Sequence, residues 1–198
     1  DVRDCKFRDI EDSGLKIQAY EGGTIENLHF SDLSMANVPR PVFLTLSKGR
    51  AGVETPEEAV AYGELQKLSF KQMSIDNSGL DKDSALMMTG TPGHPIRQVN
   101  IEGLSYIGPG GGTEEDARGR LTEFIEDDPG PVRWPEYFKL GGTVPAYGLW
   151  ARHVEGLSLK EARFSTAGPE DRPALAFEDV SELDLEGIED GEGLKRQE

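Results

Sequence analysis

Apolar residues follow one repeated spacing along most of this chain. Each repeat places four apolar residues at positions i, i+3, i+5 and i+8, with polar residues between them. The six repeats are Val2, Cys5, Phe7 and Ile10; Ile25, Leu28, Phe30 and Leu33; Leu65, Leu68, Phe70 and Met73; Ile96, Val99, Ile101 and Leu104; Val154, Leu157, Leu159 and Ala162; and Val180, Leu183, Leu185 and Ile188. The central two-residue step is the period of a β-strand, and the flanking three-residue steps indicate corners where the chain turns.

A repeat this short cannot bury its apolar face alone, so the repeats must stack on one another. Second apolar runs follow or precede most of them, at 14–20, 41–46, 84–90, 146–151 and 173–177. Each unit therefore holds at least two short strands joined by turns rich in Gly, Asp, Asn and Ser. We predict an all-β fold, a right-handed parallel β-helix, which residues 1–198 form as a single domain.

The intervals between repeats are unequal, and the longer ones predict inserted loops at about 49–62 and 108–145. Loops of this length are usually functional walls or mobile segments. Short helical turns are expected within them at 56–61 and 113–125. A leucine-rich repeat is the nearest competing solenoid, but it requires a helix in each unit and a steadier repeat length.

The charge of the chain limits the kinds of partner that it can bind. The chain carries 21 basic and 37 acidic residues, a net charge of −16, so we expect neither nucleic acid nor a membrane surface as a partner. Neither a signal peptide nor a run of roughly 18 apolar residues is present in this sequence. Cys5, the single cysteine, is expected to be a small buried hydrophobe. Histidines and acids lack metal-ligand spacing, so we predict no metal and no cofactor.

Several stretches of the sequence resemble a known family. Residues 14–18 read G-L-K-I-Q, residues 22–30 read G-G-T-I-E-N-L-H-F, and Pro41-Val42 follows. This order is similar to G-[IL]-R-I-K, G-G-x-[VI]-x-N-[IL]-x-F and P-[VI] in glycoside hydrolase family 28, the polygalacturonase family. Segments 92–96 and 145–149 resemble segments of its bacterial members. The resemblance implies a right-handed parallel β-helix and a secreted or periplasmic pectin hydrolase.

The family hydrolyses pectic polysaccharide with inversion, which requires two carboxyl groups about 6.5–9.5 Å apart. Its N-x-D, D-D and G-H-G motifs are not found on stacked strands here: the one aspartate pair, Asp127-Asp128, lies in an acidic loop, and 93–95 reads G-H-P. We therefore expect the C-terminal portion of such an enzyme, without its N-terminal coils and with no catalytic residue in this chain. Those coils, or another chain, would cover the open end of the β-helix.

Lys16 and Gln18 are the predicted substrate-binding residues. They match the Arg and Lys of the family's R-I-K strand, which contact the sugar and its carboxylate. Strand alternation places both on the face opposite Leu15 and Ile17. Lys16 keeps the positive charge without the planar fork of arginine, whereas Gln18 loses the charge. The expected partner is a polysaccharide of the galacturonan or rhamnogalacturonan type.

Aromatic side chains are the other candidates for sugar contact, because a ring suits the apolar C–H face of a pyranose. Those considered are Tyr20, Trp134, Tyr137, Tyr147 and Trp150. Aromatic residues on strands are more often core, so the loop residues Trp134 and Tyr137 are the stronger candidates for sugar stacking. The alternative to an enzyme is a non-catalytic carbohydrate-binding or structural β-helix, since fold does not fix function.

Overall fold

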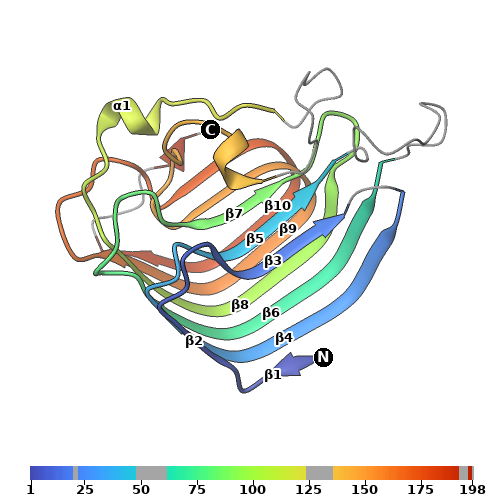
Figure 1. Ribbon diagram of the computed structural model, residues 1–198, viewed down its shortest axis with the longest axis horizontal. Coiled ribbons are helices and arrows are strands. Elements are labelled where there is room, and N and C mark those ends of the chain that lie inside the picture. Colours follow the sequence, from blue (N-terminus) through green and yellow to red (C-terminus); the bar gives the residue numbers. More distant parts are fainter. Residues whose placement is uncertain (20–21, 48–61, 124–135, 192–195, 198) are drawn as a thin grey trace.

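The computed structural model describes residues 1–19, 22–47, 62–123, 136–191 and 196–197 (Figure 1). The strands are β1 (Val2–Arg3), β2 (Lys6–Arg8), β3 (Ser13–Ala19), β4 (Thr24–Ala36), β5 (Arg40–Leu46), β6 (Glu64–Asp76), β7 (Leu86–Thr89), β8 (Ile96–Gly108), β9 (Leu149–Thr166), β10 (Leu175–Asp190) and β11 (Arg196–Gln197). Two short helices, α1 (Glu114–Ala117) and the 3-10 helix η2 (Tyr137–Lys139), complete the described elements. Every pair of neighbouring strands is parallel, which confirms the predicted all-β parallel architecture. The described residues do not contain the helix in each repeat that a leucine-rich repeat requires.

The strands form two walls that face each other across the apolar core (Figure 1). The first wall consists of β1, β2, β4, β6, β8 and the C-terminal parts of β9 and β10. The second wall consists of β3, β5, β7 and the N-terminal parts of β9 and β10. In β9 and β10 a single strand runs from the second wall into the first, because its register continues across both.

Equivalent repeat positions lie side by side in five of the six repeats. One such row across the first wall contains Leu28, Leu68, Val99, Leu157 and Leu183. Rows of this kind let each inward side chain pack on the same position of the next strand. The predicted stacking of repeats is therefore what the structure contains over 25–188.

The first repeat is displaced from the register that its spacing suggests. Val2 lies beside Phe30 rather than Ile25, and Phe7 lies beside Met35. The reason is that the steps of three and two residues alternate, so a shift of five residues returns every inward position to an inward position. The apolar pattern determines which side chains face the core, but it does not fix this register.

Each three-residue step contains a corner residue with positive φ, directly before the next inward side chain. One column of corners consists of Asn27, Lys67, Gln98, Gly156 and Glu182, and the next consists of Asp4, Asp32, Gln72, Gly103, Glu161 and Gly187. The non-glycine corners have φ between 50° and 58°, a left-handed conformation that Gly, Asn and Asp adopt at least cost. One such residue bends the strand while both neighbouring apolar side chains still point inward. These are the corners predicted from the sequence.

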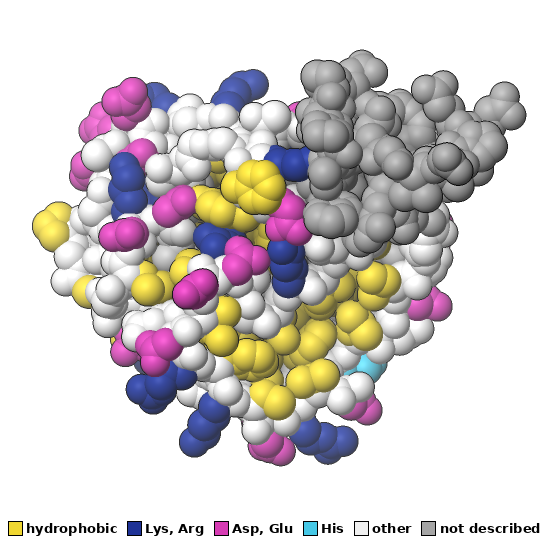
Figure 2. Space-filling model, viewed as in Figure 1, with side chains coloured by type: hydrophobic (Ala, Val, Ile, Leu, Met, Phe, Trp, Pro, Cys, Tyr) yellow, Lys and Arg dark blue, Asp and Glu magenta, His cyan; other side chains and the backbone are white. Residues whose placement is uncertain are grey.

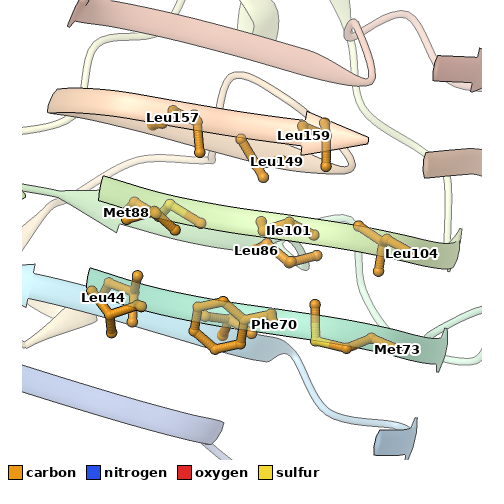
Figure 3. Close-up of a cluster of buried hydrophobic side chains, with 14 of the residues drawn as sticks. Leu44, Phe70, Met73, Leu86, Met88, Ile101, Leu104, Leu149, Leu157 and Leu159 are labelled. Atoms are coloured by element: carbon orange, nitrogen blue, oxygen red, sulfur yellow. The ribbon is translucent and has the colours of Figure 1, made fainter. Parts of the chain in front are cut away.

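Buried side chains from both walls meet in the main core (Figure 3). Leu44, Leu86 and Met88 of the second wall oppose Phe70 and Ile101 of the first, and all five are at most 1% exposed. Burial is weaker at both ends of the stack. In Figure 2 apolar side chains are visible in the hollow between β3 and β4, where the inward residues are partly buried, and Cys5 is among the half-buried residues that pack against the core there.

The described part of the long insertion covers the outer face of the second wall. Its side chains form a second apolar cluster with outward residues of that wall: Phe43, Met87, Trp150 and Ala176 meet Leu121, Tyr137, Leu140 and Val144. Of the helical turns predicted at 113–125, one forms as α1, which Thr113 caps through a hydrogen bond from the Asp116 amide. The other predicted helical turn, 56–61, and nearly all of the first insertion lie outside the described residues.

A buried ion pair fastens both ends of this insertion. Arg172 donates to both oxygens of Glu170 at 2.9 and 2.8 Å, and both side chains are at most 1% exposed. Arg172 also donates to the carbonyl of Val144 at 3.0 Å, and the amide of Gly112 donates to Glu170 at 3.2 Å. A Cβ at Gly112 would lie 2.1 Å from both partners of the pair, so this position requires glycine.

The row of leucines gives a matched test of the stacked core. Leu157 is fully buried and Leu183, its neighbour in the row, is 39% exposed. We expect Leu157→Ala to lower the free energy of unfolding by about 2–5 kcal/mol, because it leaves a cavity among packed side chains. Leu183→Ala removes the same atoms from a partly hydrated site, and we expect a loss below about 1 kcal/mol. Urea denaturation of both variants measures the difference, and equal losses would contradict the described burial.

Candidate functional site

Lys16 lies on β3 with its side chain directed away from the main core, as alternation predicts. Its ammonium contacts two carboxylates, Asp12 at 3.3 Å and Glu136 at the start of η2. Burial tends to lower the pKa of Lys16, but the bonds to Glu136 and Asp12 outweigh it and raise the pKa. The predicted sugar contact is therefore a charged lysine that already has anionic partners.

Arg40 brings a second cation to the same place. It lies beside Ser13 at the beginning of β5, and its Nε and Nη2 donate to Asp12 at 3.2 and 2.9 Å. Burial tends to raise the pKa of Asp12, but the charges and hydrogen bonds of Arg40 and Lys16 lower it overall. Asp12, Lys16, Arg40, Glu136 and Tyr137 together are called the Lys16 cluster below.

Tyr137, a residue of the long insertion, covers one side of this cluster. The guanidinium of Arg40 lies 4.2 Å from the centre of its ring, and the Phe43 ring meets it edge-on at 6.5 Å. One face of the ring is therefore already used by a cation–π contact. The sugar-stacking role of Tyr137 stays a prediction, and Trp134 lies outside the described residues.

Asp83 is a second carboxyl group near Arg40, and its pKa is shifted in the opposite direction from that of Asp12. It is half-buried and accepts a hydrogen bond from the Val144 amide at 3.3 Å. Burial raises its pKa, and the Val144 amide, Arg40 and Arg172 offset this only in part. Arg40 thus influences one carboxyl group with a lowered pKa, Asp12, and one with a raised pKa. Such divergence is typical of sites that combine an ionised carboxylate with a protonated acid.

The outward face of the second wall is mostly closed. The row that begins at Lys16 continues through Phe43, Met87 and Trp150, and these three side chains are at most 1% exposed beneath the insertion. The family resemblance implies an open cleft along this face. In the described structure, apolar packing fills that space, and the Lys16 cluster lies at its edge.

The row that begins at Gln18 is buried and polar. It continues through Thr45, Thr89 and Arg152, and Gln18 itself is half-buried. Arg152 is 1% exposed and donates to the carbonyls of Leu121 at 2.8 Å and of Thr122 at 2.9 Å. Arg152 thus binds the insertion to the second wall, and the substrate contact of Gln18 stays a prediction.

Next to Arg152, His153 forms a polar group whose partners the sequence pattern did not predict. Its Nδ1 lies 2.5 Å from Asp179, and its Nε2 lies 3.1 Å from Glu123. His153 and Asp179 are opposite each other on β9 and β10, and both have positive φ. A signal was present in the sequence, since His153 directly precedes the fifth repeat and Asp179 directly precedes the sixth.

The other candidates have mainly structural surroundings. Trp150 and Tyr147 are buried, and Tyr147 donates to Asp190 at 2.6 Å. His94, in the resembling segment 92–96, stacks on the Tyr62 ring with the ring centres 3.7 Å apart, within a turn. Tyr20 and the Asp127-Asp128 pair lie outside the described residues.

Comparison with family models, curated proteins and solved structures found no match for this chain. Among the described residues, no group of three or more His, Cys, Asp or Glu side chains is arranged to hold a metal ion. Within the same part of the chain, no helix has both the length and the apolar character needed to cross a membrane.

Asp83 allows a test of the electrostatics around the Lys16 cluster. Its pKa is higher in the folded chain than in the unfolded chain, so the folded state binds the proton more tightly and this group favours folding less as pH rises. Asp83→Asn keeps the hydrogen-bond acceptor for Val144 and removes the charge. We expect the Tm to rise at pH 7 by about 2–4 °C, and the gain to shrink as pH falls towards 4, because the carboxyl group then becomes protonated in the folded chain. Thermal unfolding from pH 4 to 7 measures this, with the exposed Asp81→Asn as control. A lower Tm for Asp83→Asn at pH 7 would contradict the assignment.

Proposed function

We propose that the chain is a right-handed parallel β-helix that binds pectic polysaccharide as the C-terminal part of a polygalacturonase-like hydrolase. The parallel, in-register stacking of its strands is the arrangement that the family fold requires. The observation that carries the functional part is the outward Lys16, on the strand that resembles the family's sugar-binding strand, at the accessible edge of the second wall. A secreted or periplasmic location belongs to the same proposal.

In this proposal Lys16 binds the sugar by exchanging partners. Its ammonium is held by Glu136 and Asp12, and a sugar carboxylate or hydroxyl would take the place of Glu136. Arg40 stays bonded to Asp12 and keeps the site preorganised. Inverting hydrolysis also requires two catalytic carboxyl groups. Because the family motifs that supply them do not occur on stacked strands of this sequence, we place the catalytic acids outside this chain.

The net charge of −16 bears on the choice of glycan. A uniform polyanion such as polygalacturonate is repelled by the overall field of the chain, and Lys16 and Arg40 are already neutralised in part by Asp12 and Glu136. A rhamnogalacturonan has fewer carboxylates per sugar, so this field opposes its binding less. Rhamnogalacturonan is therefore the favoured ligand of the two.

A second candidate function is a non-catalytic carbohydrate-binding or structural β-helix. It is favoured by one observation, the apolar packing of the insertion over Phe43, Met87 and Trp150 on the second wall. A chain that works only as a scaffold or binding module has no need for an open cleft along that face.

Incubation of the purified chain with rhamnogalacturonan and polygalacturonate separates these functions. We expect no release of reducing ends from either glycan, and retardation by rhamnogalacturonan in affinity electrophoresis. Lys16→Glu should weaken that retardation about 10-fold, the effect of roughly 1.4 kcal/mol. The control Lys6→Glu alters an exposed lysine on the first wall and should bind like the unaltered chain.

Turnover by the isolated chain would contradict the assignment of the catalytic acids to other coils. Unchanged binding after Lys16→Glu would remove Lys16 from the site. The absence of binding to both glycans would contradict the pectin-binding function and leave the scaffold as the remaining candidate.

A further inference from the structure

The outer face of the first wall has a groove that crosses the strands. Two adjacent hollows, of about 400 and 340 Å³, share the residues Ser69, Asn100 and Ser158. These three are register partners on β6, β8 and β9, so the two hollows lie on either side of one shared row and together form a broad groove across these strands. This groove lies on the opposite side of the main core from the Lys16 cluster.

The repeat itself produces the groove. Outward positions directly before the third apolar residue align in one row, which contains His29, Ser69, Asn100, Ser158 and Asp184. Neighbouring strands are about 4.8 Å apart, so these five positions span about 19 Å. Short side chains at the centre of the row leave the hollow, and an extended ligand lying across the strands meets one polar side chain from each.

Charged side chains on both sides of the row neutralise one another. On one side Lys71 pairs with Glu102 at 3.1 Å, and Lys160 pairs with Glu186 at 3.1 Å. On the other side Lys67, at a corner, pairs with Glu26 at 2.9 Å. A ligand in the groove therefore meets lysines that are already paired, together with the carboxylate of Glu182, which has no ion pair among the described residues, so a polyanion gains little there.

The floor of the groove offers hydrogen-bonding groups. Within the described part of the chain, the side chains of His29, Ser69 and Asn100 make no hydrogen bond to another residue, and Ser158 donates weakly to Asp184 at 3.3 Å. An imidazole, one hydroxyl group and an amide are thus available along the row, and the Ser158 hydroxyl can still accept a hydrogen bond. Donors and acceptors of this kind complement the hydroxyl groups of a sugar chain.

We propose that this groove binds a neutral, unbranched polysaccharide that lies across the strands of the first wall. The occupant follows from the Ser69 hydroxyl and the Asn100 amide, which have no hydrogen-bond partner among the described residues, from the paired lysines on both sides, and from the net charge of −16, which disfavours polyanions. A peptide or protein partner fits less well, because the row contains no exposed apolar side chain to act as an anchor. The site does not use Lys16, and it does not depend on the pectin-binding function proposed above.

Affinity electrophoresis in gels that contain linear galactan, linear arabinan or hydroxyethyl cellulose tests this site. We expect at least one of these neutral glycans to retard the full chain. The retardation should persist when about 0.5 M salt is added, because no ionic contact is lost to screening.

A matched pair of variants localises the binding. Ser69 and Ser74 both point outward from β6, but only Ser69 lines the groove. Ser69→Phe fills the groove and should weaken binding at least about 10-fold, whereas Ser74→Phe should leave it unchanged. Asn100→Ala removes hydrogen-bonding groups and should weaken binding about 3–10-fold. Circular dichroism and Tm measurements verify that each variant folds.

Three results would overturn this proposal: no retardation by any of the three neutral glycans, equal binding by Ser69→Phe and the unaltered chain, or equal losses in Ser69→Phe and Ser74→Phe. Binding of rhamnogalacturonan that depends on Lys16 but not on Ser69 would support the pectin site and count against the groove. The two proposals therefore fail separately.

Discussion

The architecture depends on one backbone constraint, the left-handed residue in each three-residue step of the repeat. Such a residue bends the strand without turning the next apolar side chain away from the core. Asn27 and Asp32 adopt this conformation at low cost, whereas Lys67 and Glu161 must be held in it by their neighbours. Ladder hydrogen bonds and buried rows on both sides supply that support. Backbone strain at the corners is thus offset by stacking, which is why no repeat can fold alone.

Because of the same constraint, the two walls differ in the chemistry of their outward side chains. Inward positions are fixed by the core, so differences can accumulate only at outward positions. On the second wall outward apolar residues such as Phe43 and Trp150 are covered by the insertion, and Arg152 and Arg172 satisfy the buried carbonyl groups that this covering creates. On the first wall the outward rows are polar and remain in contact with water. One repeat therefore supports a closed face and an open one.

The sequence was sufficient to predict the parallel all-β architecture, because four apolar positions at fixed spacing leave few ways to bury them. It also gave the outward direction of Lys16 from strand alternation alone. The displacement of Val2 to a position beside Phe30 was not predictable from the pattern, since a five-residue shift preserves every inward position. The partners of Lys16 were not predictable either. Glu136 is 120 residues away along the chain and lies in an insertion whose sequence has no periodic pattern. The pairing of Asp179 with His153 could have been predicted. Aligning the fifth and sixth repeats and extending the alignment one residue towards the N-terminus places the two residues opposite each other.

Polar rows on a parallel sheet differ from a pocket in how they select a ligand. A pocket recognises a shape, whereas a row offers one group from each strand at a spacing of about 4.8 Å. A flexible or compact ligand cannot use several such groups at once without losing conformational entropy. A semi-rigid linear chain loses little conformational entropy on binding, because it is already extended, and it gains a contact at each strand. The length of the row through Ser69, Asn100 and Ser158 therefore favours a polymer over a small molecule, for the same geometric reason that makes the core continuous.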